Sequence, residues 1–459
     1  MQKSMTASEL AHNASRFILD EAIVSGTGIV ASQYFEPTLR KWTKRVATID
    51  DFGDYLHYIR WYGEMFYDDE AKNFPIKQLE LWNKFKLING LYASPINAMR
   101  NKPSITRTLQ ISLYDHQDGM LGLLELYEQT KNDAFLKASI SIGNFICGIT
   151  TRYGGLIPHQ AFLEPVATPW TLCFSEVGGL YMENLCVLWR LTGDAEYLRT
   201  AQLIAKRWIE NEHFKNTGLS IQAVHHWFPW ASYNLKWHFT KPMKDNTNLI
   251  FGLIALYKTT NDERYAQAIT HALQGLRLLR KDGYCFWYDF KSQKITDSTE
   301  LLTQNHPVID VHIEAYLALK EPLFLEEAKR LTDLWLLRKD TNTGLIPEAW
   351  IGGRAIKTHC RIDAFTDFHT NCLKLAEITG DEKYREASDV AIKSMMVFAG
   401  NENHWWAELV DAYSGHILPH LNQTKFVGGP LRYFLLCEHV RKGGLIYDDS
   451  RVLSLIRDR

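Results

Sequence analysis

The chain has 459 residues, of which 46% are hydrophobic and 12% aromatic, so it is long and apolar enough to bury a large core. Its formal net charge is −2 and its estimated isoelectric point is 6.8, with Lys and Arg dispersed along the chain. This charge balance makes nucleic acid and anionic membrane surfaces unfavourable partners.

The N-terminal region predicts a helix rather than a leader sequence. Its first 26 residues carry charged groups at helical spacing, among them Glu9, Arg16 and Asp20, and they have no apolar segment of the secretory kind. No apolar run approaches the ~18 residues of a membrane-spanning helix. Seven cysteines without a C-x-x-C pair are typical of a reducing compartment. We therefore expect a cytoplasmic protein with no membrane partner, and a homodimer is left open.

Four short turn segments repeat along the chain. They are Thr130-Lys-Asn-Asp133, Thr192-Gly-Asp194, Thr260-Asn-Asp262 and Thr379-Gly-Asp381. Each separates two apolar runs with helical spacing, so the repeating unit is a helical hairpin whose turn Asp caps the second helix. The last two turns are almost twice as far apart as the others, which predicts one more hairpin with a drifted turn at 308–338.

The hairpins predict an all-α fold. Their expected ranges are 50–90, 113–149, 175–211, 245–280, 308–338 and 363–399, framed by helices at 6–24 and 430–441. Six or seven such units around one hydrophobic centre predict an (α/α)6 toroid, or an (α/α)7 toroid, with inner and outer helices. An open solenoid is the alternative. We treat residues 1–459 as one domain, with an N-terminal helix and extension (1–49), the hairpin repeats (50–441) and a C-terminal tail (442–459).

Long connections between the hairpins should all lie on one face of such a ring. They are expected at 150–174, 212–244, 281–307, 339–362 and 400–429, and loops of this length are usually functional. These connections are rich in Trp and His, whose rings and polar groups suit sugar binding. The candidate substrate-binding residues are Trp170, Trp227, Trp230, Trp350 and His159, together with His369 and Asp245 of the hairpins. Sealing the top of the core is the alternative role.

Acidic residues are expected at the loop end of the inner helices. Eighteen residues before the turn Asp of each hairpin lie Asp115, Glu176, Lys244 with Asp245 beside it, and Asp363. Asp118 and Asp367 follow one turn further on, and Glu348 comes directly after a Gly-Leu-Ile-Pro segment. Capping of helix N-termini is a structural role for any one of them. Several acids in one aromatic cleft instead suit an acid and base pair for glycosidic cleavage.

No motif in the chain calls for a cofactor. Dinucleotide-binding, Walker A and nucleophile-elbow sequences do not occur, and neither do zinc-binding patterns. We therefore predict no cofactor and no metal ligands.

The segment Asp115-His-Gln-Asp-Gly-Met-Leu-Gly-Leu-Leu-Glu-Leu-Tyr127 resembles an inner helix of the six-hairpin glycosidase superfamily of α/α toroid carbohydrate enzymes. The likeness covers roughly residues 50–440. Glycoside hydrolases of this shape imply a pair of catalytic carboxylates, and the matching positions are Asp115, Asp118, Glu176, Asp363, Asp367 and Glu348. Which two form the pair stays open.

A second relative within this group implies different chemistry. The segment Val311-His-Ile-Glu-Ala-Tyr-Leu-Ala-Leu319 is similar to the His-x-x-Glu-Ala segment of the N-acylglucosamine 2-epimerase family, although its spacing has become His-x-Glu. It implies a proton-shuttling His312, with His369 or a loop histidine opposite.

The leading hypothesis is a glycoside hydrolase that acts on a neutral or weakly charged oligosaccharide, with inversion implied by the resemblance. A sugar epimerase or isomerase is the first alternative. A helical-repeat binding protein without chemistry is the second.

Overall fold

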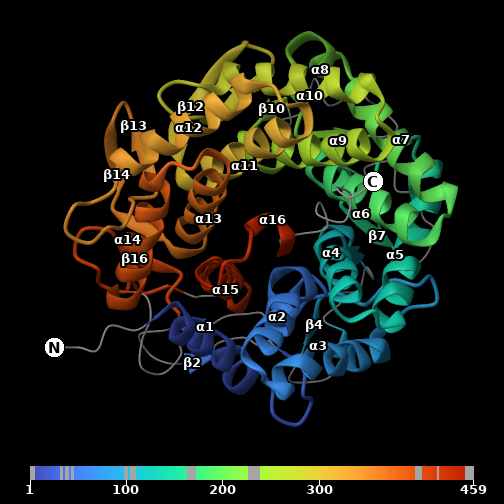
Figure 1. Ribbon diagram of the computed structural model, residues 1–459. Helices are drawn as coiled ribbons and strands as arrows, with labels where there is room; N and C mark the ends of the chain where they lie inside the picture. Colours follow the sequence, from blue (N-terminus) through green and yellow to red (C-terminus); the bar gives the residue numbers. More distant parts are fainter. Residues whose placement is uncertain are drawn as a thin grey trace.

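The computed structural model describes residues 6–30, 35–36, 41–42, 46–97, 102–103, 110–162, 172–225, 238–398, 406–420 and 423–449. These residues form a ring of helices in two concentric layers (Figure 1). The inner helices are α2 (His57–Phe66), α4 (Leu113–Thr130), α6 (Ser175–Thr192), α9 (Thr247–Thr260), α11 (Leu302–Leu319), α13 (Ile362–Thr379) and α15 (Gly428–Arg441). The outer helices are α3 (Asp69–Trp82), α5 (Asp133–Arg152), α7 (Ala195–Ile209), α10 (Glu263–Leu276), α12 (Pro322–Leu337), α14 (Glu382–Phe398) and α1 (Ala7–Arg16). The predicted toroid is confirmed.

The hairpin turns explain why the helices end where they do. Thr192 Oγ1 accepts a hydrogen bond from Asp194 N at 3.2 Å, and Gly193 between them has φ 75°, which glycine adopts without strain. The Asp194 side chain then caps α7 by accepting from Glu196 N at 2.9 Å. The predicted capping role is confirmed for this turn, and Asp262 and Asp381 accept in the same way.

Two turns differ in detail from the prediction. Asn132 caps α5, so Asp133 is the first residue of that helix instead of its cap. The drifted turn of the fifth hairpin lies at Lys320, which has φ 57°, and Glu321 precedes α12. Because α11 begins at Leu302, that hairpin starts earlier than expected.

The ring closes with a seventh pair that joins the two ends of the chain. Helix α15 completes the inner layer between α13 and α2, and α1 packs against α15 from outside (Figure 1). The structure therefore has six hairpins that are continuous in sequence and a seventh pair, which is the (α/α)7 arrangement.

Short strands connect the hairpins on the face where the inner helices begin. Strand β6 enters α4, β8 enters α6, β12 enters α11 and β15 enters α13. The antiparallel pairs are β6 with β7, β8 with β9 and β15 with β16, and a larger sheet has the order β10-β11-β12-β13-β14. The strands of these sheets are β6 (Gln110–Ser112), β7 (Gln160–Phe162), β8 (Leu172–Phe174), β9 (Ala223–His225), β10 (Phe239–Thr240), β11 (Cys285–Asp289), β12 (Lys294–Leu301), β13 (Ala349–Ile351), β14 (Arg354–Lys357), β15 (His359–Arg361) and β16 (Leu409–Asp411).

The N-terminal part of the chain contributes further short elements. These are the π-helical segments Phe17–Glu21 and Phe52–Leu56, the 3-10 turn Asn83–Phe85, and the strands β1 (Phe35–Glu36), β2 (Lys41–Trp42), β3 (Val46–Ala47), β4 (Ile96–Asn97) and β5 (Lys102–Pro103). Strand β1 pairs with β2, and β3, β4 and β5 form one antiparallel sheet. The remaining elements are α8 (Glu212–Thr217), the kinked segment Pro242–Asn246, the 3-10 turns Arg277–Leu279 and Thr424–Val427, and α16 (Ile446–Asp449).

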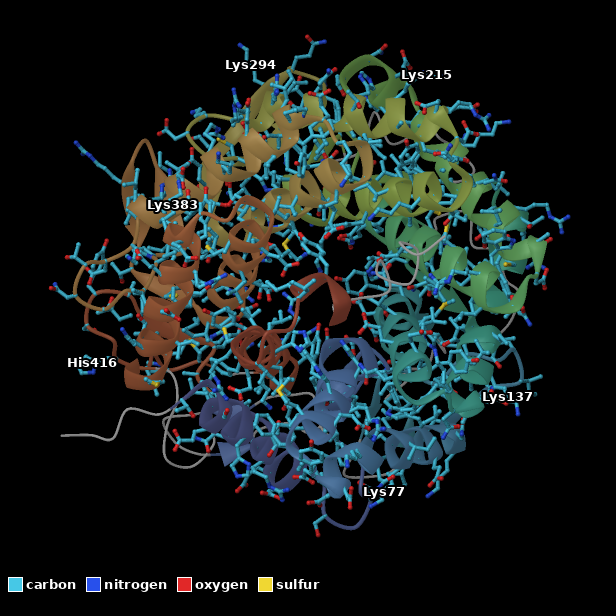
Figure 2. All side chains as sticks on the ribbon, in the orientation of Figure 1. Lys77, Lys137, Lys215, Lys294, Lys383 and His416 are labelled. Carbon is cyan, nitrogen blue, oxygen red and sulfur yellow. The ribbon has the colours of Figure 1, made fainter. Side chains whose placement is uncertain are left out.

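Apolar residues fill the space between the two layers in one continuous cluster. Inner helices α6 and α9 approach most closely at glycines, since a Cβ on Gly179 would lie 2.2 Å from the Asn248 backbone. Helix α5 has the length and mean hydropathy of a membrane span, but here it is an outer helix with Phe135 and Ile142 buried. Lysines such as Lys77, Lys137, Lys215 and Lys294 lie on the outer rim (Figure 2).

Candidate active site

A cavity of about 350 Å³ lies where the N-terminal ends of the inner helices converge. Every inner helix, or the turn before it, contributes to the lining. The polar residues that line the cavity are Asp54, Tyr58, Tyr114, Asp118, Lys244, Thr247, Asn248, Asp363, Asp367, Lys425 and Arg432. The cavity therefore lies at the loop face, the end of the inner helices where the sequence places the candidate acids.

Helix α4 provides two acids with different surroundings. Asp115 is held by two serines, since its Oδ1 accepts from Ser112 Oγ at 2.8 Å and its Oδ2 from Ser94 Oγ at 3.0 Å. Asp118 lies one turn further along α4 and lines the cavity. Burial raises the pKa of Asp118 to about 7, and the neighbouring Asp50 adds to the rise while Lys244 opposes it. A carboxyl group with this pKa retains its proton in part of the molecules at neutral pH.

The turn before α2 adds a cluster of three acids beside α4. Oxygens of Asp50, Asp51 and Asp54 lie within 4.8 Å of one another, which is a separation that a cation would bridge. Lys425 already supplies positive charge, because its Nζ lies 3.6 Å from Asp50 Oδ2. Burial, together with the charge of Asp115, raises the pKa of Asp50 to about 6. Burial also raises the pKa of Asp51 and of Asp54 well above the ordinary value.

Helix α13 places two further acids on another side of the cavity, each with an arginine partner. Asp363 accepts from Arg361 through both oxygens, at 3.1 Å and 2.7 Å. Asp367 accepts from Arg432 of α15 at Oδ1, at 2.7 Å. Within the described part of the chain, Oδ2 of Asp367 has no hydrogen-bond partner, and the side chain is 27% exposed. Asp367 thus has an oxygen available to a molecule in the cavity.

A third wall of the cavity includes Lys244 and Tyr114. Lys244 Nζ contacts the Tyr114 hydroxyl group and lies 4.6 Å from the centre of the Tyr114 ring. The predicted residue His159 lies outside the cavity lining and stacks on Tyr114, with ring centres 5.5 Å apart and an interplanar angle of 18°. Burial lowers the pKa of His159. His159 therefore packs against Tyr114 and does not face the cavity.

Four of the predicted acids lie at the loop face but outside the cavity lining, namely Asp115, described above, and the three that follow. Glu176 is the second residue of α6, and Lys241 Nζ lies 3.9 Å from its Oε2. Asp245 is fully buried and accepts from Lys241 N at 3.1 Å, and burial raises its pKa to about 8. Glu348 accepts from Thr303 Oγ1 at 2.6 Å at the start of α11, and burial raises its pKa to about 7. In the structure these carboxyl groups hold local backbone and side-chain donors.

The two predicted inner-helix histidines lie outside the cavity lining. His312 is buried between the layers, with Nδ1 bonded to Val308 O at 2.8 Å and Phe324 of α12 beside its ring. His369 is buried against Phe365 and Tyr433. Burial lowers the pKa of His312 to about 4 and that of His369 to about 3. Helix rotation directs both rings toward the apolar layer, so the structure does not bring either of them to the acids.

The predicted tryptophans fall into two groups. Trp170, Trp227 and Trp230 lie outside the described residues. Trp350 of β13 donates from Nε1 to Pro347 O at 2.8 Å and packs against Arg338. It does not line the cavity, and its contacts match the alternative role of sealing the core.

Several cavity residues were absent from the predicted set, namely Asp54, Tyr58, Tyr114, Lys425 and Arg432. A signal for the first of them existed. Asp68 caps α3, and eighteen residues before it lies Asp50, in the same register as Asp115 and Asp363 in their own hairpins. This turn has the sequence Tyr67-Asp68 without the repeated Thr, so the pattern did not point to the Asp50 to Asp54 segment.

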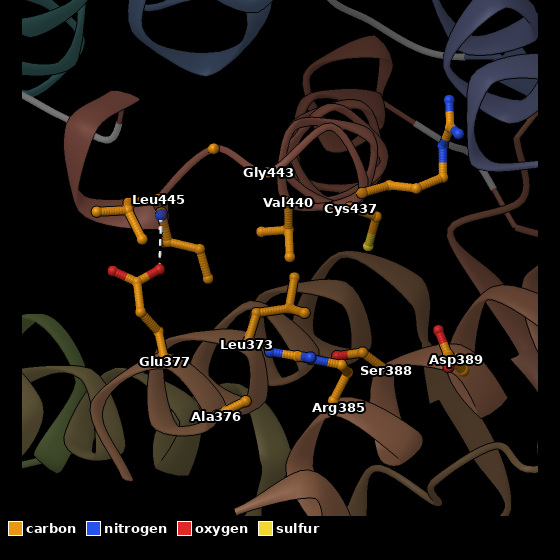
Figure 3. A pocket seen from close by; sticks show the side chains of 13 residues that line it. Leu373, Ala376, Glu377, Arg385, Ser388, Asp389, Cys437, Val440, Gly443 and Leu445 are labelled. Atoms are coloured by element: carbon orange, nitrogen blue, oxygen red, sulfur yellow. Dashed lines mark hydrogen bonds between the residues drawn. The ribbon is translucent and has the colours of Figure 1, made fainter. Parts of the chain in front are cut away.

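A second cavity of about 430 Å³ lies near the opposite end of the inner helices α13 and α15 (Figure 3). It is bounded by Leu373, Val440 and the segment that leads into α16, where Glu377 accepts from Ile446 N at 2.7 Å. Although this cavity is larger, the acids of the inner helices do not converge on it. The loop-face cavity is therefore the better candidate for the active site.

Searches for related sequences find no match, either among protein-family models or among curated proteins. Solved structures do match. An alpha-1,2-mannosidase from Trichoderma reesei is 12% identical over 94% of this chain and 91% of that chain, with a TM-score of 0.67. A sugar epimerase from a ruminal bacterium is 16% identical over 81% and 99% of the two chains, with a TM-score of 0.60. An alpha-mannanase from Bacteroides thetaiotaomicron is 12% identical over 95% and 97%, with a TM-score of 0.55. The chain therefore shares the α/α toroid fold of these solved structures.

Proposed function

We propose that the protein is a glycoside hydrolase in which Asp118 is the general acid and Asp367 the general base. The observation that carries this proposal is the pairing of two unlike carboxyl groups in one cavity. Asp118 comes from α4 and Asp367 from α13, and α2 and α15 separate these helices in the ring. A sugar between them has one carboxyl group on each side, as glycosidic cleavage requires.

Asp118 suits the role of the acid. An acid must hold its proton until the glycosidic oxygen takes it, and the buried position raises the pKa of Asp118 to about 7. The proton then passes from the carboxyl group to the leaving oxygen as the bond from that oxygen to the anomeric carbon breaks.

Asp367 suits the role of the base. The Arg432 guanidinium group donates to Asp367 at 2.7 Å, and it occupies only Oδ1. The other oxygen is free to take a proton from a water molecule that attacks the anomeric carbon. Inversion follows if the two carboxyl groups stand ~6.5–9.5 Å apart, which leaves room for that water.

The fold supports this proposal in a general way. The mannosidase and mannanase neighbours bear the names of enzymes that cleave sugars, and the epimerase neighbour bears that of a sugar-converting enzyme. Four carboxyl groups and three cationic side chains line the cavity of this chain, which favours a substrate of low net charge. A neutral oligosaccharide is the proposed substrate class.

Variants in which an amide replaces each acid test the assignment. We expect Asp118→Asn and Asp367→Asn each to lower kcat by about 10²–10⁴-fold on an oligosaccharide that the wild-type protein cleaves, because each removes one proton transfer. Product formation in ¹⁸O-water, followed by mass spectrometry, reports the hydrolytic step. Asp133→Asn is the matched control and should leave kcat unchanged, since Asp133 is an exposed residue at the start of α5, far from the cavity end of α4.

The same assay in deuterium oxide distinguishes the alternatives. Carbon-bound deuterium in a product of unchanged chain length would replace the hydrolase proposal with the epimerase one. Full activity of both amide variants would contradict the assigned pair even if hydrolysis occurs.

A further inference from the structure

Lys244 has a backbone conformation that distinguishes it from the rest of the described chain. Its φ of 65° and ψ of −60° fall in the strained γ-turn region, which side-chain-bearing residues rarely adopt. Five other non-glycine residues of the described chain have positive φ, and each lies in a turn: Tyr67, Lys131, Asn261, Gln293 and Lys320. Lys244 instead lies directly before an inner helix, at the cavity.

The surrounding structure holds this strained segment in place. Lys244 N donates to Thr247 Oγ1 at 3.0 Å, and Met243 N donates to Gln304 Oε1 of α11 at 3.2 Å. Asn246 Nδ2 donates to Lys241 O at 2.7 Å. Strain that is supported on several sides is typical of functional sites, because a relaxed backbone would point the side chain elsewhere.

The Lys244 ammonium group also differs from the other cations of the cavity. Arg432 lies 2.7 Å from Asp367, and Lys425 lies 3.6 Å from Asp50. No carboxylate of the described residues lies within 4.0 Å of Lys244 Nζ, whose partner is the neutral Tyr114 hydroxyl group. An ammonium group has three N–H donors. The Tyr114 contact occupies one of them, which leaves donors for a ligand.

We propose that Lys244 is a specificity-determining residue whose ammonium group donates a hydrogen bond to one ring hydroxyl group of a neutral sugar. This inference rests on the proposed function, since it takes the cavity to be a sugar site. Four carboxyl groups and three cationic side chains line the cavity, so it lacks the excess of positive charge that would select an anionic sugar. A hydroxyl group accepts from the ammonium group without adding negative charge.

The test combines a protein variant with altered ligands. Methyl glycosides of the neutral hexoses, and glucuronic acid, are first titrated against the wild-type protein by calorimetry. Monodeoxy analogues of the best-bound glycoside are then titrated against the wild-type protein and Lys244→Met. We expect one deoxy position to weaken wild-type binding by about 10- to 100-fold, as loss of a hydrogen bond to a charged group does. Lys244→Met should bind the parent glycoside as weakly as the wild-type protein binds that deoxy analogue. The variant should also bind the parent glycoside and that deoxy analogue with the same affinity.

Two further variants separate recognition from structure. Lys320→Met removes a lysine with φ 57° from an exposed turn, and it should leave every affinity unchanged. Lys244→Gly also lacks the amine but relieves the backbone strain, so its Tm should equal or exceed that of Lys244→Met.

The outcomes distinguish this inference from the proposed function. If the protein binds a sugar through Lys244 but hydrolyses no oligosaccharide, the hydrolase proposal would be overturned and the inference about Lys244 would stand. If the protein hydrolyses an oligosaccharide, but Lys244→Met weakens binding of the parent glycoside and of all deoxy analogues by the same factor, the inference alone would be overturned. Binding of glucuronic acid that is lost in Lys244→Met would overturn it in favour of an anionic sugar, and failure of the wild-type protein to bind any sugar would overturn both.

Discussion

At the scale of single residues, position along one helix decides what an acid does. Asp115 and Asp118 are three residues apart on α4, yet two serine hydroxyl groups hold the first, and the second faces the cavity. The same contrast separates Asp245, which is fully buried, from its neighbour Lys244, which lines the cavity. Residue type and spacing cannot distinguish these roles, because they depend on which side of the helix points inward.

The pH dependence of activity should report the state of Asp118. Burial raises the pKa of Asp118 to about 7, so the acid form is present below pH 7 and is lost as the pH rises through that value. We expect kcat/KM to fall on the alkaline side with an apparent pKa near 7. The charged groups that act on Asp118 are Asp50, Asp115, Lys244 and Lys425.

Lys244→Met provides an internal check on this interpretation. It removes a positive charge that lowers the pKa of Asp118, so the alkaline limb of the kcat/KM profile should move to higher pH. An alkaline limb that stays in place in this variant would show that another group titrates.

At the scale of helices, the inner layer depends on close contact at glycines. A Cβ on Gly179 of α6 would lie 2.2 Å from backbone atoms of Asn248. We expect Gly179→Ala to lower the free energy of unfolding by about 1–3 kcal/mol or more, because backbone on both sides must move. Chemical denaturation measures the change.

Gly148→Ala is the matched control for this substitution. Gly148 lies in α5, and a Cβ there has no other atom within 4 Å, so alanine should raise the free energy of unfolding by about 0.5–1 kcal/mol through helix propensity. Equal effects of the two substitutions would contradict the close packing of α6 against α9.

At the scale of the whole molecule, the two ends of the chain close the ring. Helix α1 packs on α15, and α15 carries Arg432, the partner of Asp367. Leu10 of α1 is fully buried, so Leu10→Ala should cost about 2–5 kcal/mol of unfolding free energy. Hydrogen exchange of α15 amides should accelerate in this variant, which links the N-terminus to the cavity.

The same substitution at an exposed site provides the comparison. Leu278 is 43% exposed, and Leu278→Ala should change the free energy of unfolding by less than about 0.5 kcal/mol. If Leu10→Ala were equally mild, α1 would not be an integral part of the ring.

The repeated turns make much of the fold predictable from local sequence. Thr and Asp at fixed positions end one helix and cap the next, and the apolar spacing marks both helices, so hairpins, their ranges and the all-α toroid are predictable. The register of eighteen residues also predicts that acids gather at the loop face. Asp118, Asp363 and Asp367 were named on that basis, and all three line the cavity.

What the sequence by itself determined is therefore the hairpin repeat and the end of the helices at which the acids lie, because helix periodicity and capping act between near neighbours in the chain. The tertiary structure alone decided that α1 and α15 form the seventh pair, that His312 and His369 point into the apolar layer, and that Lys244 lies beside Tyr114. These features depend on the rotation of each helix about its axis and on contacts between segments far apart in sequence, and no local pattern encodes either.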